Sequence, residues 1–308
     1  MKLKKIESTS SYLTNVFEEM RHLNRDLMND QVGFMRLSNY LGQLTGVSLP
    51  SNLKNHALMA NRVGSILKTL KIKKYTEYFN ILQQGDPRLI NEFISALTTH
   101  TTHFFREVAQ LDLFKKILIE YIKSKEKSSQ TEIRIWCAAA STGQEPYSLA
   151  IIVKEVLALQ PFSRWNVKIL ATDIDLASLE YAAKGVYTPN DISSLPAEFQ
   201  HYLSEKKTKD ISFYRIDQKL KSMIRFAPLN LMDVHYPFQN KFDFIFCRNV
   251  LIYFEDAVST KIIGRFEDAL SFGGHLIVGA SESGYIKKCT LTQLAPSVYI
   301  KKNTPGAK

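Results

Sequence analysis

Cysteine is scarce in this 308-residue sequence, and its three copies lie far apart. Cys137, Cys247 and Cys289 form no CxxC pair, so the sequence favours neither a disulfide framework nor a zinc site, and no other metal site is predicted. Cys137 and Cys247 also lie inside apolar runs that are typical of buried strands. Free thiols in a reducing cytoplasm are therefore expected.

Long apolar runs are missing as well. No segment approaches the roughly 20 apolar residues that a membrane-spanning helix needs, so no direct insertion into a membrane is expected. The N-terminal stretch MKLKKIESTSSYLTNVFEEM has basic residues but lacks the apolar core of a secretory signal. These features predict a cytoplasmic protein.

Acidic residues are absent from the 46 residues between Asp30 and Glu77, in a chain whose formal net charge is +10. The same stretch carries the basic residues Arg36, Lys54, Arg62, Lys68, Lys71, Lys73 and Lys74. Its apolar positions Met59, Val63, Ile66 and Leu70 recur at helical spacing, which predicts a helix that packs one face. The basic residues would lie on its exposed sides, either as a solvated surface or as a docking surface for an acidic partner.

Strand-length apolar runs alternate with helical segments from about residue 133. The predicted strands span 133–140, 167–173, 223–228, 242–247 and 274–279, and the predicted helices span about 145–159, 176–184 and 256–271. This alternation is typical of a mostly parallel sheet with helices on both faces. CTLTQL and SVYIKK predict a closing antiparallel pair, and residues 186–222 predict a small inserted subdomain. We divide the chain into a helical domain, residues 1–92, and an α/β domain, residues 93–308.

Glycine is nearly absent from the loop in IRIWCAAASTGQEPYSLAI, residues 133–151, where a dinucleotide fingerprint would have three. Gly143 stands alone before Pro146, which suits the first turn of a helix. Such a loop is a poor pyrophosphate cradle but suits a cofactor without phosphate, such as S-adenosylmethionine. Glu145 could accept a hydrogen bond from the ammonium group of that cofactor, or could simply favour the first helical turn.

An acidic residue ends the next predicted strand. Asp173 closes the apolar run of KILATDID, thirty residues after Gly143. Acids at this place commonly bind ribose hydroxyls, so a nucleoside-containing ligand is favoured over a purely structural loop. Asp175, two residues later, is expected to cap the following helix.

Five blocks resemble the signature blocks of the CheR family, the chemotaxis receptor glutamate methyltransferases. In order they are TTHTTHFFRE, CAAASTGQEPYS, ATDID, LNLMD and FCRNVLIYF, and the resemblance spans roughly residues 35 to 300. It implies an α/β, Rossmann-like class I SAM-dependent methyltransferase with a mostly parallel sheet and an antiparallel C-terminal pair. It also implies an N-terminal all-helical domain, a small β-subdomain insert, S-adenosylmethionine as cofactor and S-adenosylhomocysteine as product.

The resemblance assigns roles to individual residues. Those that match cofactor-binding positions are His100, Thr102, Arg106, Glu145, Asp173, Asn230, Leu231, Arg248 and Asn249. Glu145 matches the acid that holds the amino acid tail, Asp173 the ribose acid, and Asn230 with Leu231 the pair that flanks adenine. His100 stands where the family usually has Asn, so it either substitutes for that residue or makes no contact.

Arg106 and Tyr253 are the candidate catalytic residues. Arg106 could hold the incoming carboxylate in a fork geometry, or could instead cap a helix or contact the cofactor tail. Tyr253 lies just past the fourth strand and could align the reactants or be a core aromatic. A glutamate carboxylate is already ionised at neutral pH, because its ordinary pKa is about 4.3, so methyl transfer to it needs no general base.

The expected function is methyl transfer from S-adenosylmethionine to glutamate side chains of chemotaxis receptors. The alternatives are an RNA methyltransferase and a non-catalytic S-adenosylmethionine-binding regulator. No Asn/Asp-Pro-Pro-aromatic motif follows the fourth strand, which disfavours an RNA methyltransferase. The candidate site residues are all intact, which disfavours a non-catalytic regulator.

The expected partner is the helical cytoplasmic domain of methyl-accepting chemotaxis receptors, with no nucleic acid partner. The protein is expected to be a monomer that is recruited to receptor arrays at the membrane. The predicted docking residues are Lys54, Arg62, Lys68 and Lys71. No glycine occurs from Ser204 to Tyr214, which favours receptor methylation that does not depend on binding a C-terminal tail of the receptor.

Overall fold

The computed structural model describes residues 25–126, 131–159, 164–208, 211–286 and 289–302, and these form two compact units that divide between Thr98 and Thr99. The boundary predicted at residues 92/93 falls inside helix α5 (Pro87–Leu97). Phe93 and Leu97 of this helix are buried in the core of the first unit, which is why the unit extends to the end of α5. Residues 1–24 of the predicted helical domain lie outside the described residues.

The described part of the first unit is helical, as predicted. Its other helices are α2 (Gln31–Thr45), α3 (Leu53–Thr69) and α4 (Tyr75–Leu82). Asp30 caps α2 by accepting a hydrogen bond from the backbone N–H of Gly33 at 2.9 Å, and it also accepts one from that of Tyr75 at 3.0 Å. One carboxylate therefore caps one helix and holds the start of another.

The predicted buried face of α3 is largely confirmed. Met59 and Val63 are fully buried, and Ile66 is nearly so. Leu70 was predicted to share this face, which is wrong: α3 ends at Thr69, and the Leu70 side chain is 36% exposed.

The second unit is built on a seven-stranded sheet in the order β6-β2-β1-β7-β8-β10-β9. The strands are β1 (Glu132–Ala138), β2 (Asn166–Asp173), β6 (Ile224–Pro228), β7 (Phe242–Cys247), β8 (Leu270–Val278), β9 (Thr292–Ala295) and β10 (Val298–Ile300). β10 is antiparallel to β8 and β9, and the other pairs are parallel. The parallel sheet and its closing antiparallel pair are therefore confirmed.

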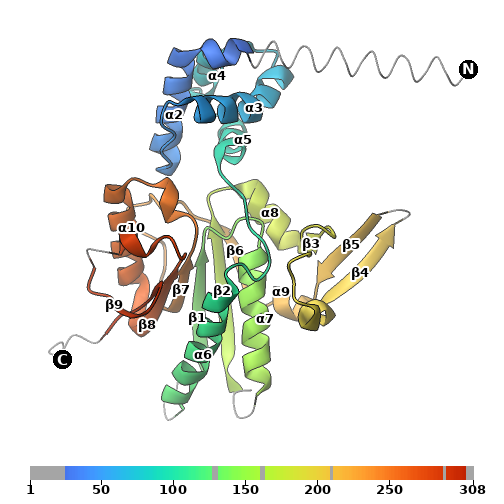
Figure 1. Ribbon diagram of the computed structural model, residues 1–308, viewed down its shortest axis with the longest axis vertical. Coiled ribbons are helices and arrows are strands. Elements are labelled where there is room, and N and C mark those ends of the chain that lie inside the picture. Colours follow the sequence, from blue (N-terminus) through green and yellow to red (C-terminus); the bar gives the residue numbers. More distant parts are fainter. Residues whose placement is uncertain (1–24, 127–130, 160–163, 209–210, 287–288, 303–308) are drawn as a thin grey trace, which may run out of the picture. The chain divides into compact units, whose positions relative to one another are not determined.

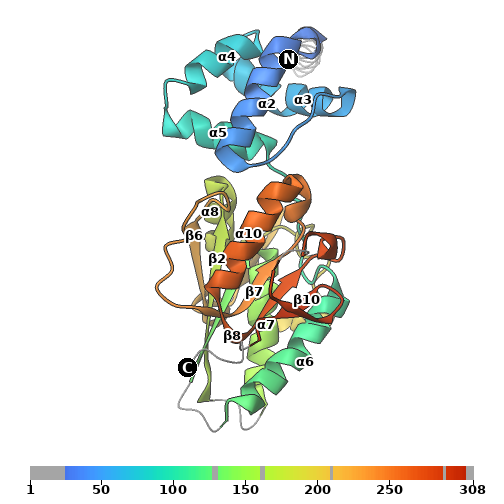
Figure 2. The same cartoon turned by 90° about the vertical axis from the view of Figure 1, so that its left-hand side faces the viewer.

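Helices cover both faces of this sheet, as Figures 1 and 2 show. α6 (Val108–Ser124) and α7 (Gln144–Ala158) pack on one face, and α10 (Asp256–Ala269) packs on the other. α8 (Leu176–Lys184) connects β2 to the inserted segment. The strand order reverses between β1 and β7, and a parallel sheet leaves a crevice for ligands at the carboxyl ends of two such strands.

The predicted insert is a small antiparallel sheet in the order β3-β5-β4. It contains β3 (Val186–Tyr187), β4 (Leu203–Thr208) and β5 (Ile211–Ile216), with the short helices η2 (Ala197–Tyr202) and α9 (Gln218–Lys221). The ring of Phe199 in η2 stacks on Phe105 at 4.9 Å, and the Tyr202 hydroxyl donates to the Glu155 carboxylate at 2.8 Å. These contacts anchor the insert to the larger sheet domain.

All three cysteines are free thiols, and Cys137 and Cys247 are buried in β1 and β7, as predicted. Among the described residues, no helix is both long enough and apolar enough to cross a membrane.

His275 of β8 is a buried titratable residue, with 6% of its surface exposed. Its ring stacks on Phe244 at 5.3 Å and meets the ring of Tyr121 edge-on at 6.3 Å. Within the described part of the chain, Nδ1 has no hydrogen-bond partner. Burial disfavours the charged imidazolium and lowers the pKa of His275 to about 4.

This shift predicts a specific loss of stability in acid. An unfolded chain protonates an imidazole near pH 6.5, whereas folded His275 stays neutral down to about pH 4. The unfolded state therefore gains protons first, and folding free energy of about 3 kcal/mol is lost as the pH falls through this window. The test is urea unfolding of wild type and His275→Phe between pH 7.5 and 4. The difference between their free energies of unfolding should narrow as the pH falls, or reverse so that the variant becomes the more stable protein. Parallel pH profiles would contradict the assignment.

Candidate functional site

Backbone strain gathers at the carboxyl edge of the central strands. Phe105, Glu107, Ala139, Ser141 and Asn249 all have positive φ, between 49° and 60°, although none is a glycine. Such a conformation costs about 1 kcal/mol or more for each of these residues, and it persists where surrounding contacts impose it. Three segments that are distant in sequence thus carry strained residues at one rim, which marks this rim as a candidate site.

The single glycine of the loop after β1 is required by packing. Gly143 has φ of +96° and precedes α7. A Cβ at this position would lie 2.7 Å from Cβ of Ala182 and 2.8 Å from the hydroxyl of Tyr187. The glycine therefore permits a close approach of α8 and Tyr187 to the start of α7.

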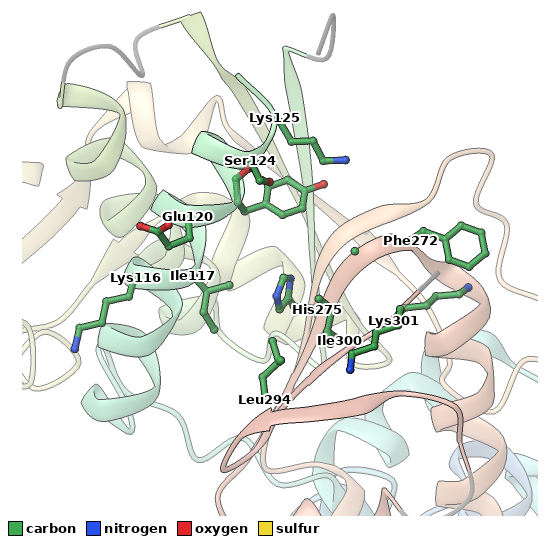
Figure 3. Close-up of a pocket in the computed structure, with 13 residues that line it drawn as sticks. Lys116, Ile117, Glu120, Ser124, Lys125, Phe272, His275, Leu294, Ile300 and Lys301 are labelled. Carbon is green, nitrogen blue, oxygen red and sulfur yellow. The ribbon is translucent and has the colours of Figure 1, made fainter. Parts of the chain in front are cut away.

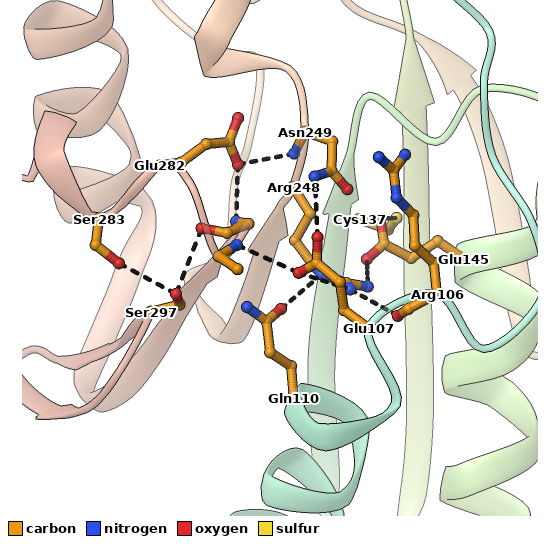
Figure 4. A network of polar contacts seen from close by, with 12 residues as sticks. Arg106, Glu107, Gln110, Cys137, Glu145, Arg248, Asn249, Glu282, Ser283 and Ser297 are labelled. Atoms are coloured by element: carbon orange, nitrogen blue, oxygen red, sulfur yellow. Dashed lines mark hydrogen bonds and ion pairs between the residues drawn. The ribbon is translucent and has the colours of Figure 1, made fainter.

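A buried guanidinium organises the rim, as Figure 4 shows. The Arg248 side chain, just after β7, is 2% exposed. Its Nε donates to the side-chain oxygen of Gln110 at 2.8 Å, its Nη1 to Glu145 at 2.6 Å, and its Nη2 to the backbone oxygen of Arg106 at 2.7 Å. Nη2 also lies 3.2 Å from a carboxylate oxygen of Glu107. Arg248 thus joins the start of α6, the start of α7 and the end of β7.

The charges of this cluster stabilise one another. Burial alone would lower the pKa of the Arg248 guanidinium, but Glu145 and Glu107 raise it above the ordinary value for arginine. Burial tends to raise the pKa of Glu107, but Asn249 and Arg248 hold it below its usual range. Both partners therefore stay ionised, as a buried ion pair must if its desolvation is to be offset.

Glu145 lies at the centre of the rim and is 11% exposed. One of its oxygens accepts from Arg248, and the other lies 3.6 Å from the Sγ of Cys137. Burial raises the pKa of the Cys137 thiol far above its ordinary value, so this thiol is the donor. A carboxylate oxygen has two acceptor positions, so Glu145 keeps capacity for a further donor such as an ammonium group.

A second buried carboxylate shapes the segment after β7. Glu282 is fully buried and accepts hydrogen bonds from the backbone N–H groups of Asn249, Val250, Leu251 and Gly279, at 2.7 to 2.8 Å. Burial raises the pKa of Glu282, and these four N–H groups oppose the shift. Since N–H groups at helix starts are otherwise orphaned, this carboxylate holds the chain entering the short helix η3 (Leu251–Tyr253).

Asp173, the predicted ribose acid, ends β2 at the same rim. Its two oxygens accept from the backbone N–H groups of Ser141 at 2.7 Å and Asp175 at 2.9 Å. Burial raises the pKa of Asp173, and the two backbone hydrogen bonds oppose this. Asp175 caps α8, as predicted, by accepting from the N–H groups of Ala177 and Ser178.

His100 contacts the start of α8. Its Nδ1 lies 3.1 Å from the Ser178 hydroxyl, and its Nε2 lies 3.5 Å from the Asp175 carboxylate. The His100 side chain is 30% exposed, and its backbone oxygen accepts from the Ser141 hydroxyl at 3.3 Å. This histidine therefore holds its segment beside Asp173 and the loop after β1.

The side chains of the two candidate catalytic residues, Arg106 and Tyr253, are not part of the buried cluster around Arg248. The Arg106 guanidinium donates to the backbone oxygen of Thr101 at 2.9 Å, and Figure 4 shows it directed away from Arg248. Tyr253 ends η3 and is partly exposed, and its hydroxyl has no hydrogen-bond partner in the described ranges. Both side chains can therefore meet an incoming group.

The other predicted cofactor-binding residues either make hydrogen bonds within the protein or are at least partly buried. Asn249 donates from its side chain to Glu107 at 3.0 Å. Asn230 accepts from the backbone N–H of Met232 at 2.9 Å, which closes a local turn. Leu231 is 7% exposed within the core beneath the rim, and Thr102 is partly buried.

Sequence reasoning missed Glu107, Gln110 and Glu282. Glu107 directly follows the FFR run and Gln110 lies three residues further on, so their nearness to Arg106 was the available signal. Nothing local marked Glu282, because three of its four backbone donors lie 31 to 33 residues before it.

The predicted docking residues of the first unit differ in their exposure. Lys54, Lys68 and Lys71 are exposed. Arg62 is partly buried, and its Nη1 donates to the backbone oxygen of Thr98 at 2.8 Å, which satisfies a carbonyl at the end of α5. Arg62 therefore has a structural role in addition to any role in docking.

Both units match known protein families. The CheR methyltransferase all-alpha domain matches residues 33–98, and the CheR methyltransferase SAM binding domain matches residues 100–297. A chemotaxis protein methyltransferase of Borreliella burgdorferi is 36% identical over 293 residues, which are 94% of this chain and 100% of that protein. One of Escherichia coli is 34% identical over 252 residues, 81% of this chain and 84% of that protein.

The four hydrogen bonds to Glu282 predict a large effect of a small substitution. In Glu282→Gln, an amide NH2 group replaces one carboxylate oxygen and faces two backbone N–H donors. We expect a loss of about 2–4 kcal/mol in the free energy of unfolding, measured in urea. Glu255→Gln, an exposed position with no cap hydrogen bond, is the matched control and should stay within about 0.5 kcal/mol of wild type. Equal stability of the two variants would refute the role given to Glu282.

Proposed function

Since this chain belongs to the CheR family of S-adenosylmethionine-dependent chemotaxis methyltransferases, we propose that it methylates glutamate side chains in the helical cytoplasmic domain of chemotaxis receptors, using the rim around Arg248. The observation that carries the proposal is the Glu145 carboxylate, held by Arg248 and partly exposed at the carboxyl ends of β1 and β7. This is the crevice in which a parallel sheet binds its ligand.

The donor set of the rim fits S-adenosylmethionine. Glu145 would hold the ammonium group of the amino acid tail, and Asp173 would accept from the ribose hydroxyls. Asn230 and Leu231 would flank adenine, with His100 and Thr102 beside the loop after β1. When bound, the cofactor supplies a methyl group on a positively charged sulfur, which a carboxylate oxygen can attack.

Arg248 and Asn249 act as positioning residues in this proposal. The guanidinium of Arg248 is occupied by Gln110, Glu145 and Arg106, which fixes the Glu145 carboxylate in one orientation. Asn249 is held by Glu107 and Glu282, which fixes the chain leading to Tyr253. A preformed site of this kind loses little conformational freedom when its ligand binds.

Arg106 and Tyr253 are proposed to align the receptor glutamate. That carboxylate is ionised at neutral pH, so no residue of this chain has to remove a proton. A fork of N–H groups on Arg106 can orient the carboxylate, and the Tyr253 hydroxyl can donate to its second oxygen. Their contribution is therefore one of orientation, which can account for several kcal/mol of a reaction barrier.

The methyl-transfer proposal predicts where label goes. Purified protein with S-adenosylmethionine labelled in its methyl group and receptor cytoplasmic fragments should give base-labile label in the receptor, because carboxyl methyl esters hydrolyse in base. Arg106→Ala should lower turnover by at least tenfold while S-adenosylhomocysteine affinity, measured calorimetrically, changes less than threefold. Base-stable label, or label in RNA supplied as competitor, would overturn the proposed substrate.

Docking through the basic surface of α3 and of the turn that follows it is a separate prediction. The triple variant Lys54→Glu, Lys68→Glu and Lys71→Glu should raise the Michaelis constant for receptor fragments about tenfold at low salt, and less at 0.5 M salt. Affinity for S-adenosylhomocysteine should not change. Arg62 is left intact because it caps α5, and Lys115→Glu on α6 serves as a single-charge control. A Michaelis constant equal to that of wild type would exclude this surface as the docking site.

A further inference from the structure

Two aromatic residues of the insert contact the segment that carries Arg106. The ring of Phe199, in the short helix η2, stacks on that of Phe105, with 4.9 Å between the ring centres and 12° between the ring planes. The ring of Tyr187, in β3, meets that of Phe104 edge-on at 5.1 Å. Aromatic rings attract one another in both arrangements at centre distances of about 4.5 to 7 Å. The insert therefore contacts both residues that directly precede Arg106.

The insert also contacts the loop after β1. The Tyr187 hydroxyl donates to the backbone oxygen of Thr142 at 2.7 Å, directly before Gly143. The Tyr187 side chain is fully buried, so this contact belongs to the core of the sheet domain. One residue of β3 thus contacts both the loop and residues 104–106, which border the rim around Arg248.

Arg106 lies between two residues with left-handed backbones. Phe105 has φ of +55° and Glu107 has φ of +56°. A bulky side chain such as that of phenylalanine rarely adopts this conformation, which persists only where surrounding contacts impose it. A return of either residue to an ordinary negative φ would turn the chain at Arg106 and redirect its guanidinium.

Different parts of the molecule hold the two strained residues. The Glu107 carboxylate accepts from the Asn249 side chain at 3.0 Å, so Glu107 is held by the end of β7. The backbone N–H of Phe105 donates to the Ser148 hydroxyl at 3.0 Å, and its ring stacks on Phe199. Since φ is the rotation about the bond between N and Cα, fixing the N–H group alone does not set it. The stacked ring holds the other side of that bond.

We propose that Phe199 is a positioning residue for methyl transfer: by stacking on Phe105 it keeps that residue at positive φ and so directs the Arg106 guanidinium toward the receptor carboxylate. The inference rests on the proposed function, in which Arg106 orients that carboxylate. Phe199 is partly exposed and acts through Phe105, from outside the buried cluster around Arg248. A purely structural Phe199 would affect stability but not the turnover of the folded protein.

The first test is methyl transfer to receptor cytoplasmic fragments by Phe199→Leu, which keeps an apolar side chain but removes the ring. Turnover should fall about fivefold or more, because the reactants are less well oriented. The calorimetric affinity for S-adenosylhomocysteine should change less than twofold, because Glu145 and Asp173 are untouched. Phe199→Tyr, which restores a ring, should regain at least half of the wild-type turnover. Wild-type turnover in Phe199→Leu would overturn the inference.

Tyr202→Leu is the matched control, because it removes a ring from the same helix η2. It also removes the hydrogen bond to Glu155, but no ring contact joins Tyr202 to Phe105 in the part of the chain that the structure describes. Phe272→Leu makes the same substitution near the start of β8, beside the cavity in Figure 3 and at the opposite end of the strand from the rim. Both should keep turnover within twofold of wild type. An equal fall in Tyr202→Leu and Phe199→Leu would overturn the inference, since loosening of the insert would then explain both.

The second test does not depend on methyl transfer. Hydrogen exchange of the Phe105 amide, followed by NMR with S-adenosylhomocysteine bound, reports opening of its hydrogen bond to Ser148. Exchange should be about fivefold faster or more in Phe199→Leu than in wild type, and unchanged in Tyr202→Leu. Equal protection in wild type and Phe199→Leu would overturn the role of Phe199. Wild type that gives no base-labile label would instead overturn the proposed function, and the exchange rates would still decide whether Phe199 holds Phe105.

Discussion

The sheet domain depends on a guanidinium that is almost completely withdrawn from water. Removing Arg248 from water costs several kcal/mol, and the cost is offset only if its donors and its charge are matched. Glu145, Glu107, Gln110 and the backbone of Arg106 provide that match. These partners come from two segments, residues 106–110 at the start of α6 and Glu145 at the start of α7, so satisfying one charge fixes both segments against the end of β7. The same contact that stabilises the fold therefore orients the carboxylate on which cofactor binding is proposed to depend.

The strained backbone and the buried Glu282 carboxylate at this rim also hold the candidate site in one conformation. Five non-glycine residues accept left-handed backbone conformations around the crevice, and Glu282 holds the chain after β7 through four backbone N–H groups. Such features reduce stability unless many contacts impose them, and they produce a site that needs little rearrangement to bind its ligand. The side chains of Arg106 and Tyr253 lie outside this rigid cluster, and they are proposed to contact the receptor glutamate.

Most of the fold could be predicted from the sequence because its signals are local. The five central strands, their helices and the closing pair follow from apolar periodicity, and the insert follows from the interruption of this pattern at residues 186–222. The five sequence blocks identified the family. Details that depend on distant neighbours could not be predicted. The sequence predicts Arg62 to be a surface cation, and only the structure shows that it binds the end of α5. The sequence predicts Arg248 to contact the cofactor, and only the structure shows that its donors are occupied by protein groups. Glu282 has no local signature, because Asn249, Val250 and Leu251, which donate to it, lie 31 to 33 residues before it.

The central claim is that Glu145, held by Arg248, receives the ammonium group of the bound nucleoside. A double-mutant cycle in calorimetric binding measures this contact directly, with wild type and Glu145→Gln each titrated with S-adenosylhomocysteine and with its analogue lacking the amino group. The account predicts that the substitution and the missing amino group each weaken binding about tenfold, and that the two together weaken it little further. Losses that multiply to about a hundredfold would mean that the ammonium group is held elsewhere.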